Sequence, residues 1–371
     1  MSEHTGQRDH SSNRSFGLDI LRAAAIVGVL LDHEITLTGI PIVGDLGYGV
    51  DLFFVLSGFL IGRIYFRDSR RPTFTLRRFW MSRWWRTLPP YAAALLLYTI
   101  VRHTTASLAT PPPPLPWYYG VFLQNYLGVT GFGPSWSLCV EEHFYLALPL
   151  VGLAIGHWLG RRAYRYVLPV LFFVPAILRY LTMLHGFPPS WYFETHLHCE
   201  ALIAGVWLAF LAIDEPATMA RVRRVAPWCT LLVPVTLFFP PIYHAMWFQL
   251  TLDNFLAFCF AACVCSLQDF GWSPATGLGR AVHWVVQLIA LSAYSLYLVH
   301  AIVDPVLRGI AANILHMHRG AARTVFVFAG ILAIGELFAY FIERPTILLR
   351  NRLMHHAPEQ TLPNPGDTGV V

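Results

Sequence analysis

The chain alternates between long apolar segments and short polar links over most of its length. Ten apolar windows are candidates for membrane spans, near residues 18–38, 48–66, 87–102, 135–158, 164–184, 196–213, 226–241, 247–268, 282–304 and 323–348. A transmembrane helix needs about 20 apolar residues, so the third and seventh windows are short. The pattern predicts an all-α, polytopic membrane bundle of ten transmembrane helices, because a membrane barrel shows only short alternating segments.

Composition agrees with a membrane protein. Of the 371 residues, 56% are hydrophobic and only 13% are charged, whereas soluble domains carry about a quarter charged residues. The formal net charge of +5 comes from arginine, because the chain has no lysine. In a membrane protein a basic excess reports topology, so we expect no nucleic-acid partner.

The arginines concentrate on alternate links between the windows. Seven fall between the second and third windows: Arg67, Arg70, Arg71, Arg77, Arg78, Arg83 and Arg86. Because cytoplasmic loops carry the excess of positive charge, this link predicts a cytoplasmic side that also contains both termini. We therefore expect a cytoplasmic tail over residues 1–16, a membrane domain over 17–350 and a disordered cytoplasmic tail over 351–371.

The first window contains ionisable residues in an otherwise apolar helix. Arg22 and His33 are eleven residues apart, which is about three helical turns and about 16 Å of rise along one face. Charged groups inside a membrane helix mark an internal functional surface by default. The alternative is that Arg22 snorkels to the interface and His33 ends the helix.

The fourth window contains two adjacent carboxylates, Glu141 and Glu142. Neighbours on a helix point about 100° apart, so at most one of them faces a given cavity. We favour Glu141, which shares a face with Ser137 and Tyr145. The alternative is that both carboxylates pair with arginines and hold the bundle together.

Estimated depths predict a layered site. His33, Glu141 and His300 fall in one layer near the outer ends of their windows, while Arg22 and Arg63 lie toward the arginine-rich side. Tyr294 and Tyr297 share a face with His300 and serve either as interface anchors or as lining of the cavity. These positions predict a polar cavity above a cationic one.

Other motifs favour packing over chemistry. Gly58 and Gly62 have the spacing that lets membrane helices approach closely. Ser57 could be a nucleophile, but a hydroxyl in a membrane helix more often bonds its own backbone. His196, His198 and Glu200 do not share one helical face, so we expect no metal.

Several motifs together carry a resemblance. Arg22 and His33, GVDLFFVLSGFLI (49–61), RRFWMSRWWRTLPPY (77–91), WSLCVEEHFYL (136–146), SAYSLYLVH (292–300) and FIERP (341–345) occur in this order. In this the chain resembles the membrane-bound acyltransferase 3 family. One family feature is missing, because the family has an arginine in the sixth window and HLHCEAL here has none.

The resemblance implies an enzyme of the bacterial inner (plasma) membrane. It moves an acetyl group from cytoplasmic acetyl-CoA to a hydroxyl of an extracytoplasmic carbohydrate, such as exopolysaccharide or a lipid-linked glycan of the lipopolysaccharide type. It also implies functional roles for Arg22, His33 and Glu141.

The residues suggest how such a reaction could proceed. Arg22, Arg63, Arg83 and Arg86 are candidates to bind the phosphates of acyl-CoA. His33 acts either as the general base or as a transient acyl carrier, with Glu141 orienting it. The rival class is a polytopic transporter or flippase, because charged groups in membrane helices also mark permeation paths.

Overall fold

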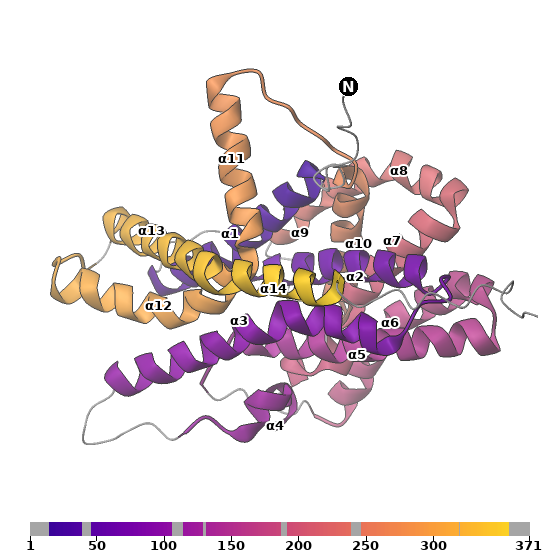
Figure 1. Ribbon diagram of the computed structural model, residues 1–371, viewed down its shortest axis with the longest axis horizontal. Helices are drawn as coiled ribbons and strands as arrows, with labels where there is room; N and C mark the ends of the chain where they lie inside the picture. Colours follow the sequence, from indigo (N-terminus) through magenta and orange to yellow (C-terminus); the bar gives the residue numbers. More distant parts are fainter. Residues whose placement is uncertain are drawn as a thin grey trace, which may run out of the picture.

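The computed structural model describes residues 15–38, 46–105, 114–128, 131–186, 191–238, 246–318 and 320–355. Throughout these ranges the regular structure is helical and contains no strand (Figure 1). The predicted tails lie mostly outside the described residues. Residues 351–355, which we expected in the C-terminal tail, instead continue the last helix.

The helices follow the apolar windows. Their bounds are α1 Phe16–Thr38, α2 Gly49–Asp68, α3 Leu76–Thr105, α4 Gln124–Leu127, α5 Ser135–Trp158, α6 Tyr164–Leu184, α7 Glu200–Asp214, α8 Pro216–Thr230, α9 Leu232–Phe238, α10 Met246–Leu267, α11 Gly277–Leu291, α12 Ala293–Asn313, α13 Ala321–Phe338 and α14 Arg344–His355. A π-helical turn, Ala339–Glu343, joins α13 to α14. Pro345 explains this turn, because its missing N–H leaves a carbonyl of the preceding turn without its usual donor.

Six helical segments in the described ranges are long and apolar enough to cross a membrane. They are Leu46–Asp68, Ser135–Trp158, Arg161–Leu184, Leu250–Leu267, Ala293–Asn313 and Ala321–Leu353. The all-helical, membrane-spanning class is thus confirmed. The count of ten spans and the cytoplasmic placement of both termini stay predictions.

Two of the predicted windows do not form single helices. The 282–304 window is wrong as one span, because the helix breaks at Ser292 and α11 stands steeply to α12 (Figure 1). The Ser292 hydroxyl donates a hydrogen bond to Glu336 Oε2 at 2.8 Å. The backbone carbonyl of Ser292 accepts the N–H of Leu296, and this hydrogen bond forms the first turn of α12. The 226–241 window is divided between the end of α8 and the seven-residue α9.

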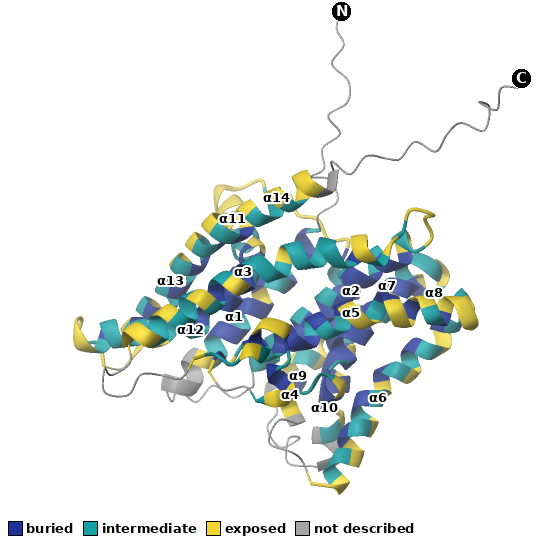
Figure 2. Cartoon of the chain, turned by 60° about the horizontal axis from the view of Figure 1, so that its bottom comes forward, coloured by how far each residue is buried: buried dark blue, intermediate teal, exposed yellow. Residues whose placement is uncertain are grey.

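Two apolar cores organise the bundle. One is built mainly from α2, α5, α6, α7 and α10, and the other from α1, α3, α12 and α13. Figure 2 shows that the buried residues lie on the inward faces of these helices. Exposed apolar side chains, such as Leu96 and Phe173, cover the outer faces of the bundle, as expected for a surface solvated by lipid.

Small residues bring α2 and α7 into close contact within the first core. A Cβ atom at Gly58 would overlap the carbonyl of Leu202, and one at Gly205 would overlap the carbonyl of Val55. At Gly62, a Cβ atom would press against Ala209 and Val206 of α7. The predicted packing role of Gly58 and Gly62 is therefore confirmed.

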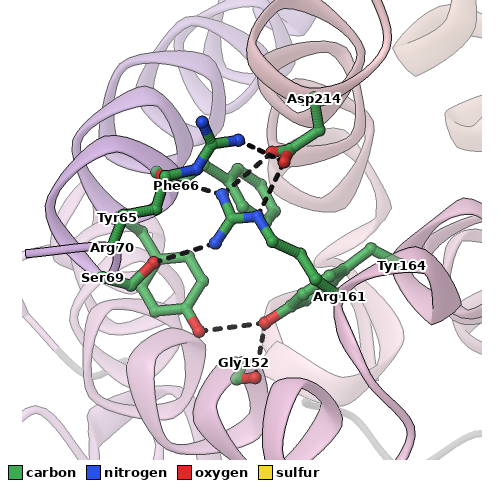
Figure 3. Close-up of polar contacts among 8 residues, drawn as sticks. All are labelled: Tyr65, Phe66, Ser69, Arg70, Gly152, Arg161, Tyr164 and Asp214. Carbon is green, nitrogen blue, oxygen red and sulfur yellow. Dashed lines mark hydrogen bonds and ion pairs between the residues drawn. The ribbon is translucent and has the colours of Figure 1, made fainter.

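Ion pairs join the helices at the end of the bundle that carries Arg70 and Arg161, which we call the arginine-rich end (Figure 3). Asp214, at the end of α7, receives Arg70 from the link after α2 and Arg161 from the link after α5. Arg161 binds the carboxylate through two nitrogens, at 2.7 and 2.9 Å, and also donates to the carbonyl of Phe66 at 2.7 Å. Arginines that mark topology in the sequence thus also join α2, α5 and α7.

A pair of tyrosines supports the same end. The hydroxyls of Tyr65 and Tyr164 lie 2.9 Å apart, and Tyr164 donates to the carbonyl of Gly152 at 2.5 Å (Figure 3). A side chain at position 152 would collide with the ring of Tyr65. Glycine there lets α5 pack directly against this ring.

Candidate active site

A cavity of about 140 Å³ lies where the two cores meet. Residues of α1, α2, α3, α5, α11, α12 and the π turn line it. Its polar lining consists of three arginines, two carboxylates, three tyrosines and three smaller hydroxyl residues: Arg22, Arg83, Arg86, Glu141, Glu343, Tyr145, Tyr294, Tyr297, Ser57, Thr87 and Ser137. Four of the six residues that the sequence predicted for the site are therefore brought together, namely Arg22, Arg83, Arg86 and Glu141.

Arg22 faces this cavity from α1 rather than the outer surface of the bundle. Its guanidinium lies 2.9 Å from the carboxylate of Asp19, which is fully buried one turn earlier. The Arg22 side chain is only 20% exposed. Snorkelling to the membrane interface therefore does not describe this arginine.

Arg83 and Arg86 lie one turn apart on α3 and reach the cavity together. Neither forms an ion pair with a carboxylate in the described ranges. The Nε atom of Arg83 is buried without a hydrogen-bond partner. Because a buried, unpartnered guanidinium nitrogen is costly, this pair of cations is suited to an anionic ligand.

The adjacent carboxylates Glu141 and Glu142 separate as predicted. Glu141 lines the cavity, close enough to the hydroxyls of Ser57 and Tyr145 to interact with them. Glu142 is buried on another face of α5, beside Trp84 of α3. Neither carboxylate pairs with an arginine in the part of the chain that the structure describes, so the bundle-holding alternative is not supported.

Ser57 does not bond its own helix, contrary to the default expectation. Its hydroxyl forms a hydrogen bond with the hydroxyl of Tyr145, so α2 and α5 are linked at the wall of the cavity. The carboxylate of Glu141 lies next to this hydroxyl pair. The two hydroxyls can therefore orient Glu141.

His33 lies outside the cavity lining and meets His300 instead. The two imidazole rings stand edge to face with their centroids 4.8 Å apart. His33 is exposed, whereas His300 is only 1% exposed. The two histidines therefore lie together, as their estimated depths predicted. The prediction was wrong for Glu141, which was expected in the same layer but lines the cavity with the arginines, so that polar and cationic groups share one cavity.

The hydrogen bonds of the histidines define their tautomers. Nδ1 of His33 lies 3.0 Å from the carbonyl of Val29, and Nδ1 of His300 lies 2.6 Å from the carbonyl of Tyr297. A carbonyl oxygen only accepts, so Nδ1 is the protonated nitrogen in each neutral ring. The lone pair then resides on Nε2, where His33 can take a proton.

A short series of side chains connects the histidines with the cavity. The ring of Tyr297, which lines the cavity, lies 5.5 Å from the ring of His300. The Tyr297 hydroxyl is 2.6 Å from that of Ser137, one turn before Glu141 on α5. His33 and Glu141 are thus linked through His300, Tyr297 and Ser137 rather than in direct contact.

The structure does not bring Arg63 to the other predicted arginines. Its guanidinium lies over the ring of Phe59 at 5.4 Å and close to Arg67 and Arg223. Arg63 is six residues after Ser57, which turns it about 120° around α2. The estimated depth of Arg63 placed it beside Arg22. This prediction was wrong because depth carries no information about direction around the helix.

The sixth window has no arginine in HLHCEAL, but a buried arginine of α6 contacts its Glu200. Arg179, which is 1% exposed, donates to Glu200 Oε1 at 2.6 Å and to Asn254 Oδ1 at 2.9 Å. It also lies 3.2 Å from Asp253. This buried network joins α6, α7 and α10, and none of its members lines the cavity.

The histidines next to Glu200 are engaged separately. His198 lies 3.2 Å from Asp51, while His196 contacts the hydroxyl of Tyr126 at 3.2 Å. Among the residues that the structure describes, no three histidine, cysteine or acidic side chains are grouped as metal ligands.

Sequence reasoning missed the place of Glu343 in the site. It lies in the π turn, lines the cavity and accepts a hydrogen bond from Ser295 at 2.5 Å. The signal was available, because an acidic residue stands directly before Arg344 and Pro345 at the end of an apolar run.

Comparison with known proteins adds independent information. A family model described as an acyltransferase domain, acyltransferase 3, matches residues 15–340. O-acetyltransferase OatA of Staphylococcus aureus (strain NCTC 8325) is 32% identical over 218 residues, which cover 53% of this chain and 34% of OatA. A provisionally named O-acetyltransferase of S. aureus (strain COL) is 30% identical over 250 residues, covering 60% of this chain and 40% of that protein.

The match therefore spans about two fifths or less of these relatives. No solved structure matches this chain.

Proposed function

Because the chain belongs to the acyltransferase 3 family, we propose that it is an integral membrane O-acetyltransferase. It transfers an acetyl, or another acyl, group from cytoplasmic acyl-CoA to a hydroxyl of an extracytoplasmic carbohydrate or lipid-linked glycan, in a bacterial inner membrane. The observation that carries this proposal is the cavity that gathers Arg22, Arg83, Arg86 and Glu141 between the two cores.

The cationic part of the cavity is suited to the donor. Acyl-CoA carries several phosphates, and the planar fork of arginine binds phosphate through two nitrogens at once. Arg83 and Arg86 form no ion pair with a described carboxylate, and Arg22, which pairs with Asp19, adds a third guanidinium to the lining. We assign donor binding to these three arginines. Arg63 does not line the cavity, so we do not assign it to donor binding.

His33 is suited to the acceptor. As general base, its Nε2 takes the proton of the sugar hydroxyl while the hydroxyl oxygen attacks the thioester carbonyl. The C–S bond then breaks, the ester C–O bond remains, and the imidazolium returns its proton to the leaving thiolate of CoA. Such proton transfer contributes roughly 10² to 10⁴ in rate.

An alternative within the same function makes His33 a transient acyl carrier, with Nε2 as the attacking atom. Either route uses the tautomer set by Val29, which leaves Nε2 free. Glu141 acts on the cavity side, where Ser57 and Tyr145 orient its carboxylate. A burst of acyl-histidine in the absence of acceptor distinguishes the carrier route from the base route.

The proposal is tested with inverted membrane vesicles that contain the protein and an acceptor glycan. Radiolabelled acetyl-CoA is added outside, and label is followed into alkali-sensitive esters of the glycan. We expect ester formation that depends on the protein. Free label accumulating inside the vesicles without ester would instead indicate a transporter.

A further inference from the structure

A second cavity, of about 370 Å³, lies between α6, α7, α8 and α10. It shares no lining residue with the first cavity. Every residue of its lining except Arg221 is apolar, and small side chains such as Ala204, Ala226, Ala261 and Ala262 create the space. The volume is within the range of roughly 300–1,000 Å³ that is usual for small-ligand sites.

This cavity opens at the outer surface of the bundle. Two of its lining residues, Val225 of α8 and Phe258 of α10, are 58% and 51% exposed. Helix α8 itself lies at the edge of the molecule beside α7 (Figure 1). An apolar cavity open to this surface is accessible to hydrocarbon chains of the bilayer, which provide the dispersion contacts that an empty void lacks.

The one polar group of the lining is a cation at the rim. Arg221 is exposed and forms no ion pair or hydrogen bond with the residues that the structure describes. Its neighbour Arg223 differs, because it pairs with Asp269 at 2.6 Å. Arg221 and Arg223 lie on α8, which begins directly after Asp214 and Glu215. Because these two carboxylates pair with Arg161 and Arg165, Arg221 belongs to the arginine-rich end of the bundle.

We propose that this cavity binds one anionic phospholipid, with an acyl chain among the alanines and the phosphate against Arg221. The two parts of the site match the two parts of such a lipid. A zwitterionic lipid could fill the apolar part equally well, but the ammonium of its headgroup offsets the phosphate charge and so weakens its attraction to the arginine. The occupant is separate from the acyl donor, which we assign to the first cavity.

The proposal is tested by native mass spectrometry of the full-length protein, titrated with phosphatidylglycerol or with phosphatidylcholine of the same chains. Photoreactive phosphatidylglycerol, with its diazirine on the acyl chain, then reports where the chain lies. We expect preferential binding of phosphatidylglycerol and crosslinks to residues of α7, α8 and α10 at this cavity. Arg221→Gln should weaken binding about fivefold, as expected for one basic side chain at an anionic lipid.

Matched variants separate the site from general effects of charge and bulk. Arg224→Gln removes an exposed arginine of the same helix that does not line the cavity, and should bind phosphatidylglycerol as the wild type does. Ala261→Phe fills the cavity and should abolish the crosslinks, whereas Ala147→Phe, at an exposed position on α5, should not.

Equal effects of Arg221→Gln and Arg224→Gln would overturn the proposal. So would equal binding of the two lipids, or unchanged crosslinks in Ala261→Phe. Because the readout is lipid binding, these results are independent of acyl transfer.

Discussion

In the proposed reaction, the chemistry depends most on His33. We predict that His33→Ala lowers acyl transfer by about 10² to 10⁴, because Nε2 is the free base that the bond to Val29 leaves. Transfer of label to glycan, normalised to the amount of protein in the membrane, measures the effect. His157→Ala is the control, since His157 is an exposed histidine of α5 outside the cavity. Full activity of His33→Ala would remove both of its proposed roles.

Arg22 should act on the donor rather than on the acceptor. We predict that Arg22→Ala raises the KM for acyl-CoA about tenfold, the effect of losing roughly 1.4 kcal/mol of binding, because Arg22 faces the cationic cavity from α1. Initial rates with each substrate varied in turn provide the measurement. An equal rise in the KM for the acceptor would argue against separate donor and acceptor ends.

Single residues were predictable where the chemistry is unusual. A charge inside an apolar run indicates a candidate site, which is why Arg22, His33 and Glu141 became candidates from the sequence. Arg22 and Glu141 line the cavity, whereas His33 lies outside its lining. Direction around a helix was predictable only from local neighbours. The neighbours Ser137 and Tyr145 predicted the direction of Glu141 correctly. Arg63 was grouped with Arg22 by its estimated depth, and this grouping was wrong.

Among the described elements, α2 and α7 approach each other closely at their glycines. We predict that Gly58→Val lowers the free energy of unfolding by about 1–3 kcal/mol or more, because its side chain would overlap the backbone at Leu202. Thermal unfolding in detergent measures the loss. Gly309→Val on α12 is the control, since nothing lies within 4 Å of a Cβ atom there. Equal melting temperatures for the two variants would contradict this close approach.

The link between α6, α7 and α10 rests on Arg179. We predict that Arg179→Met costs about 3–5 kcal/mol of stability, because it leaves the buried carboxylates of Glu200 and Asp253 without their arginine. Arg165→Met, which removes an exposed pair with Glu215, should cost far less, because solvent screens that pair. The same unfolding assay compares them, and a loss for Arg179→Met as small as that for Arg165→Met would show that the network is not structural.

Elements were predictable where hydropathy and helix length agree. The windows at 135–158 and 164–184 correspond closely to α5 and α6. Hydropathy averages over direction, however, so it could not detect the break at Ser292, where apolar residues continue on both sides. The contact that defines this break, from Ser292 to Glu336, joins residues 44 positions apart.

At the scale of the whole molecule, the two cores explain the position of the site. Polar groups inside a membrane bundle need partners or a cavity, and the junction between the cores provides that cavity. The helical class followed from the apolar windows, and the family followed from the order of the motifs. The pairing of His33 with His300, and the indirect link from them to Glu141, required the packing of α1 against α12 and the hydrogen bond between Ser137 of α5 and Tyr297 of α12.

The central claim is that the arginine cavity binds the donor while His33 performs the transfer. The most direct test measures acetyl-CoA binding and acyl transfer in the same preparations of three proteins: the wild type, His33→Ala and the double variant Arg83→Gln/Arg86→Gln. The account predicts that His33→Ala binds acetyl-CoA normally but transfers acyl groups about 10² to 10⁴ times more slowly, whereas the double variant loses both binding and transfer. Loss of acetyl-CoA binding in His33→Ala, or normal binding in the double variant, would contradict it.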